Sequence, residues 1–510
     1  MHPVVSYLNP FCPRLLALLV AAVLLVTGGV ARGAGSKPNI IYILADDLGW
    51  GSVGCYGADT NLVRTPNIDR LAREGRRFTD ANCAASICSP SRYSILTGRY
   101  CWRTSLKFAV LPDTAPLHIA TNRLTIASLL KAQGYATAAI GKWHLGFGIT
   151  QPNFTATLRP GPLDVGFDYF YGLPSNHGDP SGIYLDTEME APDGTAIRVA
   201  GLRSTQLAPF GTNYYGNKPF YGLDAPQRVD VDVMPHLTDK AIAWIHQQKP
   251  GKPFFLYFTP VAVHEPVTPS AATKGTSQAG LYGDWIHELD RTVGQILDEL
   301  DKQHLNDHTL VIFTSDNGGE NRYGFHAWDG FEGGSNKKAV AAGLKMNGDW
   351  RAGKHSIYEG GLREPFIVRW PGKVPAATVS DEPICLVDTL ATVAAVVGAK
   401  LPPPDQGAED SYNILPAMLG EKYTSPIRPA LIGHSGWSVF SVRQGSWKWV
   451  EGKFAPVKEP KSEKNGFHPQ LYNLAEDPQE TRDVIAEHPD IAAKLAMLLE
   501  QYRQQGYSRY

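Results

Sequence analysis

The chain has 510 residues, a formal net charge of −2 and 43% hydrophobic residues. This length allows one large domain and a smaller one, and the 50 glycines and 38 prolines are typical of a compact enzyme with many loops, which excludes a disordered chain. Lysine and arginine form no run in the sequence, so nothing indicates a nucleic-acid partner.

Residues 1–33 have the pattern of a secretory signal peptide. Arg14 precedes the uncharged apolar run Leu15–Val30, and small residues follow it. This order predicts export, to a secreted or periplasmic location. The alternative is an uncleaved membrane anchor, for which this run is short. No other segment is long and apolar enough to span a bilayer, so no stable membrane span is expected.

Two apolar runs end in pairs of oxygen-bearing side chains. Asn39–Ala45 predicts a strand buried on both faces, and Asp46 and Asp47 follow it. A second predicted strand, Thr309–Thr314, leads to Asp316 and Asn317. Strand ends are where α/β sheets bind ligands, although either pair alone would also fit a solvated turn. Three carboxylates and an amide favour calcium or magnesium, and calcium of the two.

The segment from Cys88 to Arg99 predicts a short helix with a cysteine at its first residue. Pro90 suits the first turn, Arg92 lies on the same helix face as Cys88, and Gly98 ends the segment. A helix N-terminus favours negative charge, so the position suits a reactive or modified thiol that faces an anion. The alternative is a buried structural cysteine or one half of a disulfide.

Basic residues follow other predicted strands. Lys142 and His144 come just after the strand Ala136–Ile140, and His264 follows Pro253–Thr259. A lysine and a histidine that converge on one point suit an anionic substrate and proton transfer. Taken alone, they would more often be a surface lysine and a histidine satisfied in the core.

The order of elements predicts the architecture. Strands and helices alternate up to about residue 400, which favours an α/β sandwich with a mostly parallel or mixed sheet. From about Arg428 short alternating strands and a terminal helix predict a small antiparallel sheet with one helix. We therefore expect a catalytic domain over residues 34–427 and a C-terminal subdomain over residues 428–510.

Three stretches carry a family resemblance. Cys-x-Pro-Ser-Arg-x-x-x-Leu-Thr-Gly from Cys88 and Gly-Lys-Trp-His-Leu-Gly from Gly141 resemble the two sulfatase signatures. The run Lys-x-x-x-Tyr-Glu-Gly-Gly-x-Arg from Lys354 is similar to a third family motif. The resemblance covers nearly the whole chain after residues 1–33. It implies an alkaline-phosphatase-like sandwich, with a large mixed sheet flanked by helices, and the hydrolysis of sulfate esters.

The resemblance also implies the cofactors and the roles of the site residues. A formylglycine-generating enzyme would convert Cys88 to formylglycine (3-oxoalanine), whose hydrated aldehyde attacks sulfur. One Ca²⁺ would be held by Asp46, Asp47, modified Cys88, Asp316 and Asn317. Arg92 and Lys142 would hold the formylglycine diol, and His144 would take the proton from its second hydroxyl. His264 and Lys354 would bind sulfate and protonate the leaving oxygen.

The substrate and two alternative functions stay open. We expect a sulfated sugar or an aryl sulfate as the substrate, and aromatic residues in 174–235, including Tyr214 and Phe220, as part of its rim or as a plain surface excursion. A phosphate or phosphonate ester hydrolase on the same fold is the alternative enzyme. The non-enzymatic alternative is a secreted glycan-binding protein with a catalytically dead site.

Overall fold

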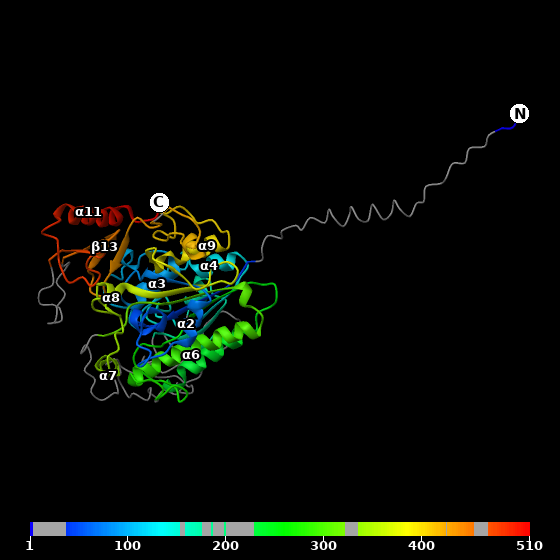
Figure 1. Ribbon diagram of the computed structural model, residues 1–510, viewed down its shortest axis with the longest axis horizontal. Coiled ribbons are helices and arrows are strands. Elements are labelled where there is room, and N and C mark those ends of the chain that lie inside the picture. Colours follow the sequence, from blue (N-terminus) through cyan, green and yellow to red (C-terminus); the bar gives the residue numbers. More distant parts are fainter. Residues whose placement is uncertain are drawn as a thin grey trace. The chain divides into compact units, whose positions relative to one another are not determined.

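The structure is a computed structural model that describes residues 1–3, 37–152, 159–175, 185–186, 198–199, 229–321, 335–424, 426–452 and 468–510. It divides into two units, Met1–Lys37 and Pro38–Tyr510, and the second holds all the elements below (Figure 1). The expected signal peptide (1–33), except for its first three residues, and the expected aromatic rim around Tyr214 lie outside the described residues. Among the helices of the described part, none has the length and apolar character needed to cross a membrane.

The centre of the Pro38–Tyr510 unit is a mixed β-sheet, as predicted. Its strands follow the order β10 (Thr378–Ser380), β2 (Arg76–Asn82), β9 (Arg363–Arg369), β8 (Thr309–Ser315), β1 (Asn39–Ala45), β7 (Phe254–Thr259), β3 (Ala136–Lys142), β4 (Tyr169–Leu173), β5 (Leu185–Asp186) and β6 (Arg198–Val199). A short strand, β11 (Ile384–Cys385), pairs with β2. The strands β8, β1, β7, β3 and β4 are mutually parallel, whereas β9 runs antiparallel to both β8 and β2.

Helices cover both faces of this sheet. The helices of the described part are α2 (Pro66–Arg73), α3 (Cys88–Thr97), α4 (Ile126–Ala132), α5 (Val233–His246), α6 (Gly280–Lys302), α7 (Ser335–Ala341), α8 (Glu359–Leu362), α9 (Thr389–Val396), α10 (Leu415–Leu419) and α11 (Pro489–Gln505). The last of these, α11, packs on the smaller C-terminal sheet instead. Short 3₁₀ helices occur at Trp50–Ser52, Gly54–Tyr56, Cys101–Arg103, Pro162–Val165, Asp230–Asp232, Asn306–His308 and Leu386–Asp388.

The alternation of side chains along β1 divides the core into two layers. Tyr42 and Leu44 share a cluster with residues of α3, α4 and α9. Ile41 and Ile43 point to the opposite face and join the cluster of α2, α5 and α6. Because both faces of β1 are covered, all seven of its residues are buried, as its apolar sequence predicted.

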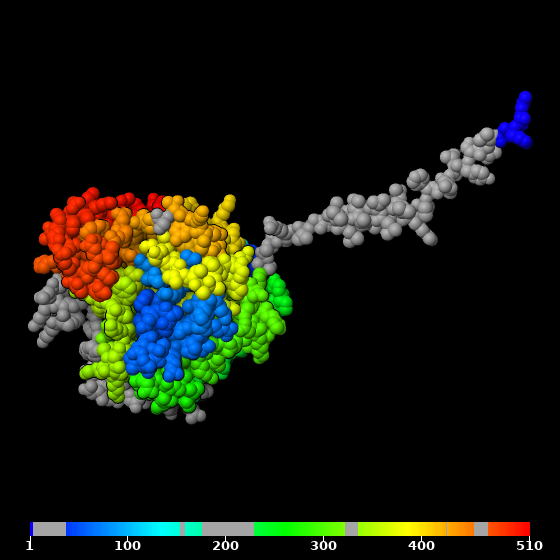
Figure 2. All heavy atoms as spheres, viewed as in Figure 1, coloured from blue at the N-terminus to red at the C-terminus, as the bar shows by residue number. Residues whose placement is uncertain are grey.

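The C-terminal part forms a second, antiparallel sheet. Its strands are β12 (Leu431–His434), β13 (Phe440–Gln444), β14 (Trp447–Val450) and β15 (Gln470–Asn473). Val442 on β13 and Leu495 and Leu499 on α11 belong to one buried cluster. In Figure 2 the orange and red surface of these elements occupies one end of the unit. The small sheet and its helix were predicted, and the boundary between residues 427 and 428 stays a prediction.

Candidate active site

The parallel strands bring the predicted polar residues to one edge of the large sheet. Asp46 and Asp47 follow β1, and Asp316 and Asn317 follow the adjacent strand β8, whose Ser315 pairs with Ala45. On the other side of β1, the segment after β7 is tied to the acidic pair. The Asp46 amide donates to Ala262 O at 3.0 Å, and the Val263 amide donates to Asp46 O at 2.7 Å. His264 is the next residue.

Cys88 enters this edge from the first turn of α3. All ten residues of α3 are buried, and the helix ends at Gly98, which adopts the left-handed conformation with φ 64°. Cys88 is only 2% exposed, and its Sγ lies 3.8 Å from Asp46 Oδ1 and 3.9 Å from Asp47 Oδ1. The sequence therefore predicted correctly that Cys88 lies at a helix N-terminus, and the structure adds that two carboxylates face it.

The Cys88 thiol is not activated as a thiolate. Burial raises its pKa, Lys142 and Lys354 oppose this, and the result is a pKa of about 12. A thiol in this state is protonated at neutral pH and is a poor nucleophile. All five cysteines in the described ranges are free, so Cys88 is not half of a disulfide there.

Three buried carboxylates are matched by three buried cations. Two nitrogens of Arg92 approach Asp316 Oδ2, Nε at 2.9 Å and Nη2 at 2.8 Å, and Nη2 also lies 3.3 Å from Asp46 Oδ1. The Lys142 ammonium donates to both Asp46 oxygens, at 3.0 and 2.7 Å. A buried charge without a partner is costly, so this matching is a condition for the fold as well as a feature of the site.

Lys354 and Asp47 form a second lysine–aspartate pair, and Asp47 also faces Cys88. The Lys354 Nζ lies 2.6 Å from Asp47 Oδ2. Burial lowers the pKa of Lys354, but the surrounding negative groups, Asp47 first among them, together hold that pKa well above its ordinary value. Burial raises the pKa of Asp47, but its neighbours, Lys354 first among them, together hold the pKa of that carboxyl below its usual range. Lys354 is therefore charged in this pocket.

The donor atoms at this edge form a possible metal site. Ligand atoms of Asp46, Asp47, Cys88 and His264 lie within 4.8 Å of one another. Asn317 Oδ1 is buried and has no hydrogen-bond partner among the described residues, which leaves it available as a ligand. In this arrangement Asp316 Oδ1 accepts from the Asp47 amide at 3.1 Å, while Oδ2 faces Arg92. Carboxylate and amide oxygens are the ligands that calcium prefers.

Backbone carbonyls determine which nitrogen of each histidine carries its proton. His144 Nε2 lies 3.0 Å from Leu111 O, and His264 Nδ1 lies 2.5 Å from Glu265 O. A carbonyl only accepts, so these two nitrogens are the donors. His144 Nδ1, which is buried and has no partner in the described chain, therefore carries the lone pair. The second nitrogen of His264, Nε2, lies 3.7 Å from Asp47 Oδ2.

Both histidines are neutral in this environment. Burial and the nearby cation Lys142 lower the pKa of His144 well below its ordinary value. Burial and Lys354 lower the pKa of His264 to about 3, although Asp47 opposes the shift. A neutral imidazole at His144 is able to accept a proton, and its role as a base stays a prediction.

All the predicted site residues thus gather at one place, and the structure adds two that the sequence did not indicate. Leu111 contributes only its carbonyl, which orients His144. Asn347 accepts from the Gly319 amide at 2.7 Å and donates to Gly319 O at 3.0 Å, so it holds the turn that follows Asn317. Neither residue belongs to a motif, and a backbone carbonyl leaves no signal in a sequence.

Comparison with known proteins decides the family. The model of the family described as Sulfatase matches residues 38–399. The chain belongs to the sulfatase family. This sulfatase is 35% identical over 492 residues to an N-acetylgalactosamine-6-O-sulfatase of Bacteroides thetaiotaomicron, with 91% of this chain and 93% of the relative covered. It is 31% identical over 512 residues to the human N-acetylgalactosamine-6-sulfatase, with 93% and 87% covered.

A solved structure agrees with the sequence relatives. The sulfatase superimposes on a chain from work on the metabolism of multiple glycosaminoglycans by Bacteroides thetaiotaomicron, with a TM-score of 0.81, 34% identity and coverage of 92% of this chain and 100% of that chain. The predicted alkaline-phosphatase-like fold is confirmed, and the protein is a sulfuric ester hydrolase. The separate roles assigned to the site residues remain predictions.

Proposed function

We propose that this sulfatase removes sulfate from a sulfated carbohydrate, with N-acetylgalactosamine 6-sulfate as the first candidate, through formylglycine made from Cys88 and one bound Ca²⁺. The observation that carries the proposal is the position of Cys88. Its side chain lies within 4 Å of both Asp46 and Asp47, in a pocket that keeps the thiol protonated and therefore unreactive. Conversion of this residue supplies the nucleophile that the thiol does not.

The calcium ligands we propose are Asp46, Asp47, Asp316, Asn317 and the modified residue 88. His264 also lies near this group, but imidazole is a poor ligand for calcium and a good one for zinc. Calcium bound there would supply positive charge that favours ionisation of an oxygen at residue 88. Formylglycine would supply, as its hydrate, one oxygen for attack on sulfur and a second whose deprotonation releases the sulfate.

Side chains of the protein itself bind the sulfate, transfer the protons and position residue 88. Lys354 is charged and lies beside residue 88, so it binds a sulfate oxygen, and together with His264 it is the proton donor that we propose for the leaving alcohol. His264 lies beside it and contributes a hydrogen bond to the sulfate or the leaving oxygen. His144, with its lone pair at Nδ1, accepts the proton from residue 88. Arg92 and Lys142 position residue 88 by holding Asp316 and Asp46.

The same proposal includes maturation and export. A formylglycine-generating enzyme acts on Cys88 as the partner, and residues 1–33 direct the chain to a secreted or periplasmic location. A phosphate monoester carries one more negative charge than a sulfate monoester, and the basic pocket is able to accept either. Paired sulfate and phosphate esters of one aryl alcohol therefore separate the sulfatase from the phosphoester alternative, and we expect faster release of sulfate.

The deciding experiment uses the chain co-expressed with a formylglycine-generating enzyme. We expect hydrolysis of an aryl sulfate and of N-acetylgalactosamine 6-sulfate, formylglycine at residue 88 by mass spectrometry, and no turnover by Cys88→Ala. Cys385→Ala is the matched control, because Cys385 is equally buried and burial raises its pKa to about 12 as well. Turnover that survives Cys88→Ala would refute the proposed nucleophile. A Cys88 that stays unmodified would support the dead glycan-binding alternative, and a converted but inactive chain would indicate strict glycan selectivity or the phosphoester alternative.

A further inference from the structure

The family motif that begins at Lys354 contains two charged residues to which the proposed mechanism gives no role, Glu359 and Arg363. Both are buried, and Arg363 Nε donates to Glu359 Oε2 at 2.9 Å. Glu359 is the first residue of α8, which lies beside the small C-terminal sheet (Figure 1). The contacts of Glu359 with the C-terminal part of the chain therefore indicate what this half of the motif does.

One lysine of the small sheet bridges two buried glutamates. Lys448, on β14, has its Nζ 2.8 Å from Glu359 Oε1 and 2.8 Å from Glu480 Oε1. Glu480 follows β15, and all three side chains are almost completely buried. Because buried charges are tolerated only where opposite charges compensate them, this arrangement fixes α8 relative to the segment after β15.

Glu480 also contacts both ends of the loop that carries Lys354. Its Oε2 accepts from the Glu359 amide at 2.7 Å, and its backbone oxygen accepts from Arg351 Nη1 at 2.6 Å. A third bond closes the loop at the same place, because the Gly360 amide donates to Arg351 O at 2.8 Å. The base of the loop is therefore fastened to one residue of the C-terminal part of the chain.

The backbone of this loop needs support from outside. Ala352 and His355, on either side of Lys354, adopt the left-handed region with φ 61° and 71°. Glu480 itself has φ 56° and is fully buried. Residues other than glycine hold such conformations only where the surrounding contacts determine them. The bonds made by Glu480 supply that support at the base of the loop.

The tip of the loop reaches the active site. The Lys354 amide donates to Gly319 O at 3.1 Å, and Lys354 Nζ lies 2.6 Å from Asp47 Oδ2. Between the tip and the base, the Arg351 guanidinium lies 3.6 Å from the centre of the Tyr358 ring. The loop is therefore a packed unit held between the active site and Glu480, and a shift at its base is transmitted to Lys354.

We infer that Glu480 is a positioning residue of the sulfatase reaction, which holds from the C-terminal sheet the loop that presents Lys354 to residue 88 and to the sulfate. The inference rests on the proposed function for the role of Lys354. Glu480 is fully buried and does not contact the substrate, so it acts through Lys354. No bond is made or broken at Glu480.

A double-mutant cycle tests whether Glu480 acts through Lys354. The wild type, Glu480→Ala, Lys354→Ala and the double variant are each co-expressed with the converting enzyme and assayed on 4-nitrophenyl sulfate, with rates corrected for formylglycine content. We expect Glu480→Ala to lower kcat/KM about tenfold in the wild type and by less than about twofold in Lys354→Ala. Losses that multiply, or a Glu480→Ala protein as active as the wild type, would overturn the inference.

The leaving alcohol provides a readout that a loss of stability does not change. A poor leaving group depends on the proton that we assign to Lys354 and His264, and a good leaving group depends on it less. We expect Glu480→Ala to lower kcat/KM about 10²-fold on phenyl sulfate, against about tenfold on 4-nitrophenyl sulfate. Equal losses on the two esters would show only a smaller amount of folded enzyme and would contradict the positioning role.

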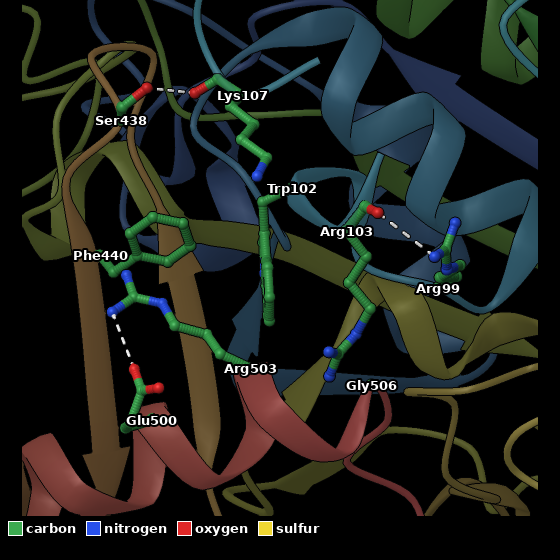
Figure 3. A pocket seen from close by; sticks show the side chains of 9 residues that line it. All are labelled: Arg99, Trp102, Arg103, Lys107, Ser438, Phe440, Glu500, Arg503 and Gly506. Atoms are coloured by element: carbon green, nitrogen blue, oxygen red, sulfur yellow. Dashed lines mark hydrogen bonds and ion pairs between the residues drawn. The ribbon is translucent and has the colours of Figure 1, made fainter. Parts of the chain in front are cut away.

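Asp410→Ala is the matched control. Asp410 is also fully buried, accepts from the Tyr100 amide at 2.9 Å and lies 2.8 Å from Arg103. Arg103 lines a separate cavity with Trp102 and Arg503 (Figure 3), so this pair stabilises the fold away from Lys354. We expect Asp410→Ala to lower the melting temperature and to leave the ratio of kcat/KM for the two esters as in the wild type.

A second variant decides the question if Glu480→Ala does not fold. Arg351→Met keeps an unbranched chain over Tyr358 and removes the donor to the Glu480 carbonyl. We expect the same larger loss on phenyl sulfate, and equal losses on both esters would again overturn the inference. The proposed function is tested separately, because turnover of aryl sulfates by the converted wild type depends on none of these variants.

Discussion

Two nitrogens of Arg92 converge on a single oxygen of Asp316, with Nε at 2.9 Å and Nη2 at 2.8 Å, and both side chains are fully buried. Burial raises the pKa of Asp316 to about 6 and the Arg92 charge opposes the rise. The guanidinium therefore favours the ionised form of Asp316, which its proposed role as a calcium ligand requires. Arg92, which lies on α3, therefore influences the charge of a carboxylate at the edge of the large sheet.

Replacement of Arg92 by lysine tests that connection. Lys keeps the charge but loses the planar fork, so the contacts to Asp316 and Asp46 cannot both be maintained. We expect kcat/KM on an aryl sulfate to fall by about 10²-fold or more. The conservative control is Arg482→Lys, because the Arg482 side chain is 67% exposed. Equal activity of the two variants would mean that Arg92 is not a positioning residue.

His144 and His434 offer a matched pair of buried histidines. Both donate from Nε2 to carbonyls of the same segment, His144 to Leu111 O at 3.0 Å and His434 to Lys107 O at 3.1 Å. Only His144 lies at the active site. We therefore expect His144→Gln to lower kcat on an aryl sulfate by about 10²- to 10⁴-fold, the range for a general base, and His434→Gln to leave it nearly unchanged. A similar loss in both variants would indicate a structural effect.

Calcium should stabilise the fold as well as support turnover. Three carboxylates gather at the sheet edge, so a cation that binds the folded state alone raises the free energy of unfolding by about 2.7 kcal/mol at a hundredfold excess over Kd. We expect the chelated protein to lose activity and melt at a lower temperature, and calcium to restore both. Asp47→Asn should weaken the calcium-dependent shift in melting temperature. A shift that zinc produces and calcium does not would contradict the proposed ion.

His434 predicts a pH dependence of stability that is independent of the active site. Burial lowers its pKa to about 4, Arg503 adds to this, and the hydrogen bond to Lys107 opposes it. The unfolded chain, with a histidine pKa near 6.5, takes up a proton first as the pH falls. Stability from the neutral imidazole is therefore complete above about pH 6.5 and is lost progressively toward pH 4, by up to about 3 kcal/mol.

Urea unfolding at several pH values checks this. The wild-type free energy of unfolding should fall between pH 6.5 and pH 4 more steeply than that of His434→Gln, since the variant has no group to protonate there. Other buried histidines act in the same direction in both proteins, so the difference between the two curves isolates His434. Parallel curves would show that His434 titrates alike in the folded and unfolded chains.

The apolar strands and the motifs could be predicted from the sequence, and the polar strands could not. β1, β7 and β8 are continuous hydrophobic runs, and α6 has regular apolar spacing. By contrast β2, with the sequence Arg-Arg-Phe-Thr-Asp-Ala-Asn, looks like a loop. Its Asp80 is buried because two arginines from elsewhere in the chain compensate its charge, Arg363 on β9 at 3.1 Å and Arg443 on β13 at 2.7 and 2.6 Å. A strand whose charges are satisfied from a distant element carries no local pattern.

The active site likewise has features that the sequence predicts and features that it does not. Motifs indicated which residues take part, because those positions are filled by specific side chains. They could not indicate that Asp47 and His144 adopt the left-handed region, with φ 60° and 56°, or that a carbonyl of Leu111 selects the tautomer of His144. These features depend on where separate segments of backbone meet, which single-residue identities do not encode.

The complete burial of α3 determines whether an enzyme can reach Cys88 after the chain has folded. Cys88 is 2% exposed, and every other residue of its helix is buried as well. An enzyme that converts Cys88 must bind the surrounding peptide, and in the folded chain that peptide is out of reach. If Cys88 is converted as we propose, we therefore expect conversion to precede folding, and a chain that folds first to stay unconverted until it is denatured and refolded in the presence of the converting enzyme.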